Sequence, residues 1–149
     1  MPAAHALLQA ADDLEHAARD LTVTELWTSP NGAAPVGFHL RHIAGSIDRL
    51  LTYARGETLS RAQLATLAAE REPGDPPADA AAGLEAARGA IAGALNVLRA
   101  TPRDALLEPR AVGRAALPST VLGLLVHVAE HTQRHVGQVV TTAKVVRAP

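Results

Sequence analysis

The stretch that decides the fold is His127-Val-Ala-Glu-His131-Thr-Gln-Arg-His135-Val-Gly-Gln138, in which three histidines stand four residues apart. On an α-helix, residues four apart differ by about 40° around the axis and about 6 Å along it, so the three imidazoles share one face. A neighbouring pair can bind one metal ion, but His127 and His135 are about 12 Å apart along the helix, whereas a zinc–nitrogen bond is about 2 Å. The spacing therefore predicts two ligands from this helix and a third from another element.

The residues around this stretch continue the helical pattern. The expected helix opens at Pro118 and Ser119 and runs to about Lys144. Its apolar stripe consists of Val121, Leu125, Val128, Val136 and Val139. Since the histidines lie about 100° from the centre of that stripe, we expect the metal at the rim of a helical bundle, open to water and substrate.

The rest of the chain also predicts helices. Apolar residues recur at three- and four-residue spacing in Ala3–Leu21, Pro35–Arg55, Asp79–Ala100 and a shorter segment, Ser60–Arg71. Residues 101–117 indicate an extended connection that holds a short hairpin. The fold class is therefore all-α: an antiparallel four-helix bundle with a short extra helix and long connections, forming a single domain over residues 1–149.

Composition narrows the chemistry. The chain is 48% hydrophobic and 19% charged, as in a soluble globular protein, and 2% aromatic, so the core must be aliphatic and alanine-rich. It contains no cysteine, which excludes disulfides, thiolate ligands and a cysteine nucleophile. Any thiol in the reaction would come from a small molecule.

Charge and the N-terminal sequence argue against two classes of partner. The formal net charge is −1 and the basic residues are dispersed, so we expect no nucleic acid partner. The first 20 residues carry acids by the second turn and have no long apolar run. We therefore expect no signal peptide, no membrane association and a cytoplasmic location.

Two histidines in the Pro35–Arg55 segment are candidates for the third ligand, His39 and His42. A helical wheel places His39 nearer the apolar stripe, and geometry alone does not choose His42. His5 and His16 are isolated, and we expect them to be solvated surface side chains.

Two blocks carry a resemblance to a known family: VGFHLRHIAGSIDRLLTYARG at 36–56 and GLLVHVAEHTQRHVGQVV at 123–140. Together they resemble the DinB/YfiT-like superfamily of small four-helix-bundle proteins, over most of the chain from Thr22 to Arg147. The family binds a divalent metal, typically zinc or nickel, through one histidine of its second helix and an HxxxH pair followed by Gly-Gln. The resemblance therefore implies His42, His131 and His135 as the metal ligands.

The resemblance places further residues in the pocket or beside the ligands: Trp27, His39, His127, Arg134 and Gln138. Trp27 resembles an aromatic residue that precedes the second helix in the family, with packing under a loop as its alternative role. Arg41 and Arg134 adjoin ligand positions and are candidates for binding a carboxylate, or else ordinary surface arginines.

The resemblance also implies a reaction. Family members include transferases that use low-molecular-weight thiols such as bacillithiol or mycothiol, and a thiol-dependent maleylpyruvate isomerase. The expected function is thus a metal-dependent S-transferase that directs such a thiol onto an electrophilic small molecule, in a chain that forms a homodimer. Since ligation needs neutral imidazoles, the metal should leave below about pH 6.

Two alternatives stay open at this point. One is a non-catalytic metal-binding or stress-response bundle. The other is a zinc hydrolase of the HxxEH type, in which His127 and His131 bind the metal and Glu130 is the general base. The Asp79–Ala100 segment lacks the His, Asp and Glu pattern of a di-iron bundle, so the site should hold one metal ion.

Overall fold

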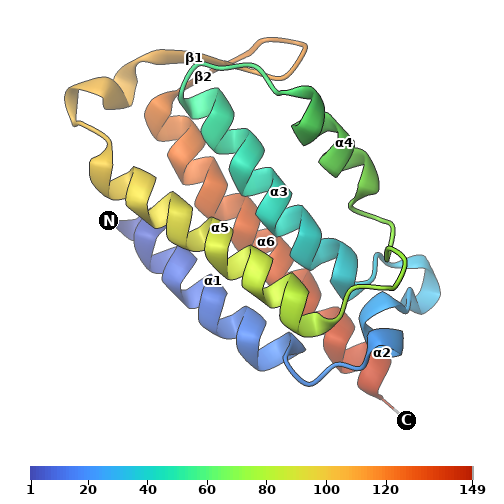
Figure 1. Ribbon diagram of the computed structural model, residues 1–149. Coiled ribbons are helices and arrows are strands. Elements are labelled where there is room, and N and C mark those ends of the chain that lie inside the picture. Colours follow the sequence, from blue (N-terminus) through green and yellow to red (C-terminus); the bar gives the residue numbers. More distant parts are fainter. Residues whose placement is uncertain (149) are drawn as a thin grey trace.

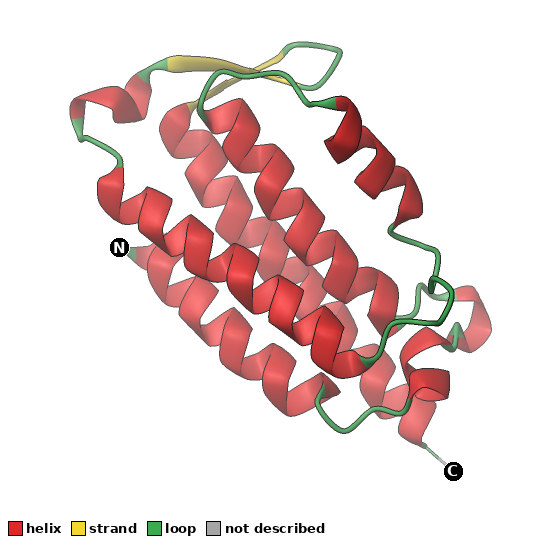
Figure 2. Ribbon diagram, viewed as in Figure 1, coloured by secondary structure: helices red, strands yellow, loops and turns green. Residues whose placement is uncertain are grey.

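The computed structural model describes residues 1–148 as a bundle of helices (Figure 1); Pro149, the end of the predicted domain, lies outside the described residues. The long helices are α1 (Pro2–Ala18), α3 (Val36–Ala54), α5 (Ala80–Ala100) and α6 (Val121–Arg147). The shorter elements are α2 (Val23–Trp27), α4 (Arg61–Ala69), 3₁₀ turns at Pro30–Gly32 and Asp104–Leu107, and the strands β1 (Pro109–Val112) and β2 (Leu117–Thr120) (Figure 2). The predicted all-α bundle is confirmed.

The long helices form a ring in which α6 packs against α1 and α3, and α5 packs against the same two. Helices α1 and α6 run in one direction, and α3 and α5 in the other (Figure 1). Because α3 and α5 are parallel, the connection that carries α4 must return along the outside of the bundle. Helices α3 and α6 are antiparallel neighbours, so histidines from distant parts of the sequence can meet between them.

The core is aliphatic, as the composition requires. The predicted stripes of α3 and α6 are buried throughout, with Leu40, Ile43, Leu125 and Val139 among the residues that are 2% exposed or less. Each such side chain contributes about 1.5–3 kcal/mol through burial. The histidines on the shoulder of α6 therefore project from a closely packed support.

The start of α6 was predicted wrongly. Pro118 and Ser119 belong to β2, where they pair with Ala111 and Arg110 of β1, and the helix begins at Val121. The Thr120 side chain accepts a hydrogen bond from the backbone N–H of Gly123 and caps the helix. The short hairpin expected in this connection is confirmed, and α6 continues to Arg147, beyond Lys144.

The first helix also ends earlier than predicted, at Ala18, with Leu21 buried beyond it. A short helix that was not predicted, α2, follows after residues 19–22. Thr22 and Glu25 form a reciprocal capping box at its start, which is the signal that the sequence carried for it.

Helix α4 lies on the surface, and none of its residues is buried. Its predicted first residue, Ser60, is instead the N-cap, hydrogen-bonded to Gln63. The residue that follows the helix, Glu70, is 2% exposed. Within residues 1–148, no helix is both long and apolar enough to cross a membrane.

Candidate metal centre

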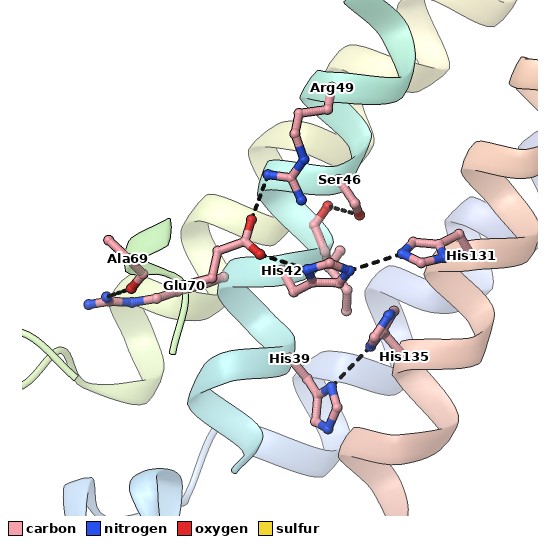
Figure 3. A network of polar contacts seen from close by, with 10 residues as sticks. His39, His42, Ser46, Arg49, Ala69, Glu70, His131 and His135 are labelled. Atoms are coloured by element: carbon pink, nitrogen blue, oxygen red, sulfur yellow. Dashed lines mark hydrogen bonds and ion pairs between the residues drawn. The ribbon is translucent and has the colours of Figure 1, made fainter. Parts of the chain in front are cut away.

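Three histidines meet between α3 and α6. His42 comes from α3, and His131 and His135 come from successive turns of α6; each offers a ring nitrogen, and these nitrogens all lie within 4.8 Å of one another (Figure 3). The Nε2 atoms of His42 and His131 are 3.0 Å apart. Two nitrogens bound to one tetrahedral zinc ion at about 2.0 Å would lie about 3.3 Å apart. The arrangement is therefore compatible with one small divalent ion.

The ring environment keeps the two α6 histidines neutral. Burial, followed by the neighbouring charge of His42, lowers the pKa of both His131 and His135 to about 4. In the described part of the chain, the buried Nδ1 of His131 has no hydrogen-bond partner. Neutral imidazoles with unshared nitrogen lone pairs are the form that binds a metal ion.

His42 makes a second contact, on the side of its ring away from His131. Its Nδ1 lies 2.7 Å from Oε2 of Glu70, and the other carboxylate oxygen of Glu70 accepts a 2.6 Å hydrogen bond from Arg49 (Figure 3). Burial raises the pKa of Glu70, but the hydrogen bonds from His42 and Arg49 outweigh it and leave the pKa lowered. Glu70 is therefore an ionised acceptor beside a candidate ligand.

Neither Glu70 nor Arg49 was predicted to belong to the site. Arg49 follows His42 by seven residues, two helical turns, so it lies on the same face of α3 and could have been noticed. Glu70 comes from the segment after α4, and no spacing distinguishes it from the nearby Glu57 and Glu72. Only the path of the chain brings Glu70 to His42.

His39, the other candidate on α3, lies behind the group of three. It is 4% exposed, and its Nδ1 is 3.0 Å from Nδ1 of His135. Burial, followed by the charge of His42, lowers its pKa to about 4. The structure thus places His39 against one candidate ligand, while the nitrogens of His42, His131 and His135 form the cluster.

A pocket of ≈ 250 Å³ opens beside the cluster. It is lined by His42, His131 and His127, together with polar and apolar residues of α3 and of the segment that carries α4. His127 is exposed on α6, and its Nδ1 lies 3.1 Å from Glu130. The structure thus places the His127 side chain in the wall of this pocket.

A second pocket, of ≈ 480 Å³, includes His39 in its wall. His39, Arg134 and Gln138 line it, with small residues of α6 and of the loop before α3. The exposed Arg134 side chain donates to Glu130 one turn earlier on the same helix. Two of the residues expected beside the ligands, Arg134 and Gln138, thus face this second pocket.

Trp27 and Arg41 make structural contacts. The indole of Trp27 packs on Gly37 and donates a 2.8 Å hydrogen bond to the carbonyl of Ala78. The Arg41 guanidinium lies 5.1 Å from the centre of the Trp27 ring and donates to backbone carbonyls of residues 69–73. These contacts of Trp27 fit its alternative role, which is packing.

Of the HxxEH residues, only His131 belongs to the cluster of three ligand nitrogens. Glu130 is 49% exposed by its side chain and is paired with Arg134 and His127. The hydrogen bond from Arg134 is the main cause of its lowered pKa, which makes the carboxylate a weaker base. Glu130 and His127 lie outside the cluster of three ligand nitrogens.

No curated protein matches the chain. The sequence does match the DinB superfamily over residues 6–139, a range that includes all of α3 and the part of α6 that carries His131 and His135. Because this match covers most of the chain, the protein belongs to the DinB superfamily.

Proposed function

We propose that the protein binds one divalent metal ion, zinc or nickel, through His42, His131 and His135, and transfers a low-molecular-weight thiol to an electrophilic small molecule. The observation that carries the proposal is the convergence of three ring nitrogens within 4.8 Å beside a pocket. Membership of the DinB superfamily supports it. The homodimer remains a prediction, which sedimentation analysis tests.

The donor set suits this chemistry. When bound by three neutral imidazoles, a divalent ion keeps its full charge and lowers the pKa of a thiol or water placed beside it. With pKa values lowered to about 4, His131 and His135 are neutral at pH 7, and Nε2 of His42 lies 3.0 Å from Nε2 of His131. The chain therefore supplies ligands without first having to lose protons from His131 or His135.

The pocket beside the cluster suits a small, partly apolar substrate. It is lined by Leu50, Leu59 and Leu67 together with His42 and His131. Apolar walls favour binding of the apolar part of such a substrate. In the proposed reaction the sulfur forms a bond to the electrophilic carbon, the leaving group departs with the electron pair of its bond, and the thiol proton passes to solvent.

Metal content and thiol transfer test the proposal together. The purified protein is loaded with zinc or nickel, dialysed, and supplied with bacillithiol, mycothiol or glutathione and the chloride-releasing electrophile monochlorobimane. We expect a fluorescent conjugate with at least one thiol, and loss of this activity after treatment with a chelator. As a control, the Glu130→Gln variant should keep the activity, because Glu130 is outside the cluster.

The alternatives give other results. Stable metal binding without conjugation of any thiol would support the non-catalytic metal-binding protein. Loss of peptide hydrolysis in Glu130→Gln, with no thiol transfer in the wild type, would support the HxxEH hydrolase. Failure to bind either metal would contradict both metal-dependent enzymes.

A further inference from the structure

We propose that Glu70 is a positioning residue of the metal centre: its carboxylate holds His42 with the proton on Nδ1 and the lone pair on Nε2. This inference rests on the metal site proposed above. Histidine ligands commonly donate their second N–H to a carboxylate, which fixes the tautomer and the direction of the ring. The 2.7 Å contact between His42 Nδ1 and Glu70 Oε2, opposite the Nε2 that faces His131, has this geometry.

Glu70 is held in place from α3. Nothing in α4 is buried, yet the residue that follows this helix is 2% exposed. The Arg41 side chain donates to the carbonyls of Ala69 at 3.4 Å and of Pro73 at 3.0 Å, on either side of Glu70. Arg41 thus holds the backbone of this segment on α3, and Glu70 extends from it toward His42.

The surface of α3 has space for the carboxylate because residue 45 is a glycine. A Cβ atom at Gly45 would collide with Oε1 of Glu70 and lie 2.7 Å from Nη1 of Arg49. Both of these atoms belong to the ion pair between Glu70 and Arg49. Any larger residue at this position would displace the group that contacts His42.

The ring of His42 is also held by its face. Phe38, one turn earlier, stacks on it with ring centres 5.3 Å apart and planes 23° apart. The guanidinium of Arg71 lies 4.7 Å from the centre of the Phe38 ring. Stacking restricts the plane of the imidazole but does not select which nitrogen carries the proton. Glu70 makes that selection, because an ionised carboxylate can only accept.

The Glu70 carboxylate contacts the proposed ligand His42 and does not itself point toward the proposed metal position. One of its oxygens contacts Nδ1 of His42 and the other accepts from Arg49. The two nitrogens of an imidazole point to different sides of the ring, so the carboxylate and His131 lie on different sides of His42. The group within 4.8 Å accordingly contains three histidines and not Glu70.

Zinc affinity measured by competition with a chromophoric chelator tests the role of Glu70. We expect Glu70→Gln to weaken zinc binding about 10- to 100-fold, the usual effect of losing such a partner. Glu130→Gln is the matched control, since Glu130 also contacts a histidine and an arginine but is exposed. The zinc affinity of this variant should stay within about twofold of that of the wild type. Wild-type affinity in a folded Glu70→Gln variant would overturn the proposal.

A second variant covers the case in which Glu70→Gln does not fold, because it leaves the buried Arg49 without a carboxylate. The double variant Arg49→Met/Glu70→Gln removes both members of the ion pair, a replacement that proteins often tolerate. We expect it to fold, with the same loss of zinc affinity. Wild-type affinity in the folded double variant would likewise overturn the proposal.

The tautomer of His42 can be read without metal, by ¹⁵N NMR of the metal-free protein at pH 8. We expect Nδ1–H in the wild type and a shift toward Nε2–H in Glu70→Gln, since the glutamine amide can donate to Nδ1. An unchanged tautomer would contradict the positioning role. If the wild type binds no zinc, the proposed function fails, whereas the tautomer still tests the contact between Glu70 and His42.

Discussion

Two carboxylates in this protein have the same kinds of partner and opposite surroundings. Glu70 contacts His42 and Arg49, and Glu130 contacts His127 and Arg134. The side chain of Glu70 is 2% exposed and that of Glu130 is 49% exposed. Exposed ion pairs exchange easily with water, whereas a buried carboxylate holds its partners in fixed positions. The difference shows that burial, and not the set of contacts, makes Glu70 a candidate for a functional role.

The two carboxylates also differ in how they are connected along the chain. The partners of Glu130 are three and four residues away on one helix. Those of Glu70 are 28 and 21 residues away. The first set forms from helix geometry alone, but the second requires the connection through α4 to return along α3. The HxxEH motif that is visible in the sequence therefore contains the exposed carboxylate, Glu130, and not the buried carboxylate, Glu70.

The largest expected effect is the difference in stability between a variant without Glu70 and a variant without Glu130. Glu70→Ala leaves Arg49 buried without its partner, and breaking a buried pair in this way costs about 3–5 kcal/mol in the free energy of unfolding. Glu130→Ala should cost about 0–1 kcal/mol, as for other exposed pairs. Urea unfolding of the metal-free proteins measures both. Equal losses in the two variants would remove the distinction between the buried and the exposed carboxylate.

Crowding Glu70 without removing it should have an intermediate effect. Gly45→Ala places a methyl group against Glu70 and Arg49, and overpacking of this kind costs about 1–3 kcal/mol, reduced by the gain of about 0.5–1 kcal/mol of alanine over glycine in a helix. Gly93→Ala, on α5 with nothing within 4 Å of the added Cβ, should instead be neutral or stabilise by about 0.5–1 kcal/mol. Thermal unfolding compares them. A stabilised Gly45→Ala protein would show that Glu70 and Arg49 can move away from residue 45 at little cost.

The buried region also predicts a pH dependence. The pKa values of His39, His131 and His135 fall to about 4 from an ordinary value of 6.5. Between these values the unfolded chain binds more protons than the folded one, so stability is complete above about pH 6.5 and falls as pH decreases toward 4. Melting temperatures in the presence of a chelator measure this. The decrease should be smaller in His39→Gln, which removes one of the titrating groups, and a flat profile would contradict the burial.

The same pKa values refine the expectation for metal loss. Ordinary histidines would release the metal below about pH 6. Because burial already disfavours protonation of His131 and His135, competition by protons at these two ligands should begin at a lower pH. Metal retained on a desalting column across a pH series gives the midpoint, and a midpoint above pH 6 would contradict the prediction.

The smallest expected effect is that of salt on stability. Of the two carboxylates, only Glu130 should show it. At about 1 M ionic strength the Debye length is about 3 Å, so exposed pairs are largely screened whereas buried pairs are screened much less. The stability difference between the wild type and Glu130→Ala should therefore vanish in high salt. The difference for Glu70→Ala should persist. Salt-dependent losses of equal size would indicate that both carboxylates are accessible to solvent.

Much of the fold follows from periodicity. The apolar stripes of α3 and α6 are buried as predicted, since three- and four-residue spacing relates directly to one face of a helix. Errors occur at element ends, where local hydrogen bonds decide the boundary. Pro118 and Ser119 resemble a helix start, but their backbone pairs with β1. The return of α4 along the bundle depends on packing between distant segments, which periodicity does not encode.

For the site, the sequence predicted the histidines and missed their support. The spacing of His131 and His135 is local, and the choice of His42 over His39 came from the resemblance. The structure brings His42, His131 and His135 into one cluster and places His39 behind it. Glu70 could not be identified, because its contact with His42 exists only in the folded chain.

The most direct test of the account is elemental analysis of the purified protein beside two histidine variants. We expect about one divalent ion per chain in the wild type and in His16→Ala, whose histidine is exposed on α1 and outside the cluster. His131→Ala should contain almost none, because two imidazoles hold such an ion weakly. Full metal content in a folded His131→Ala protein, or none in the wild type, would contradict the three-histidine metal centre.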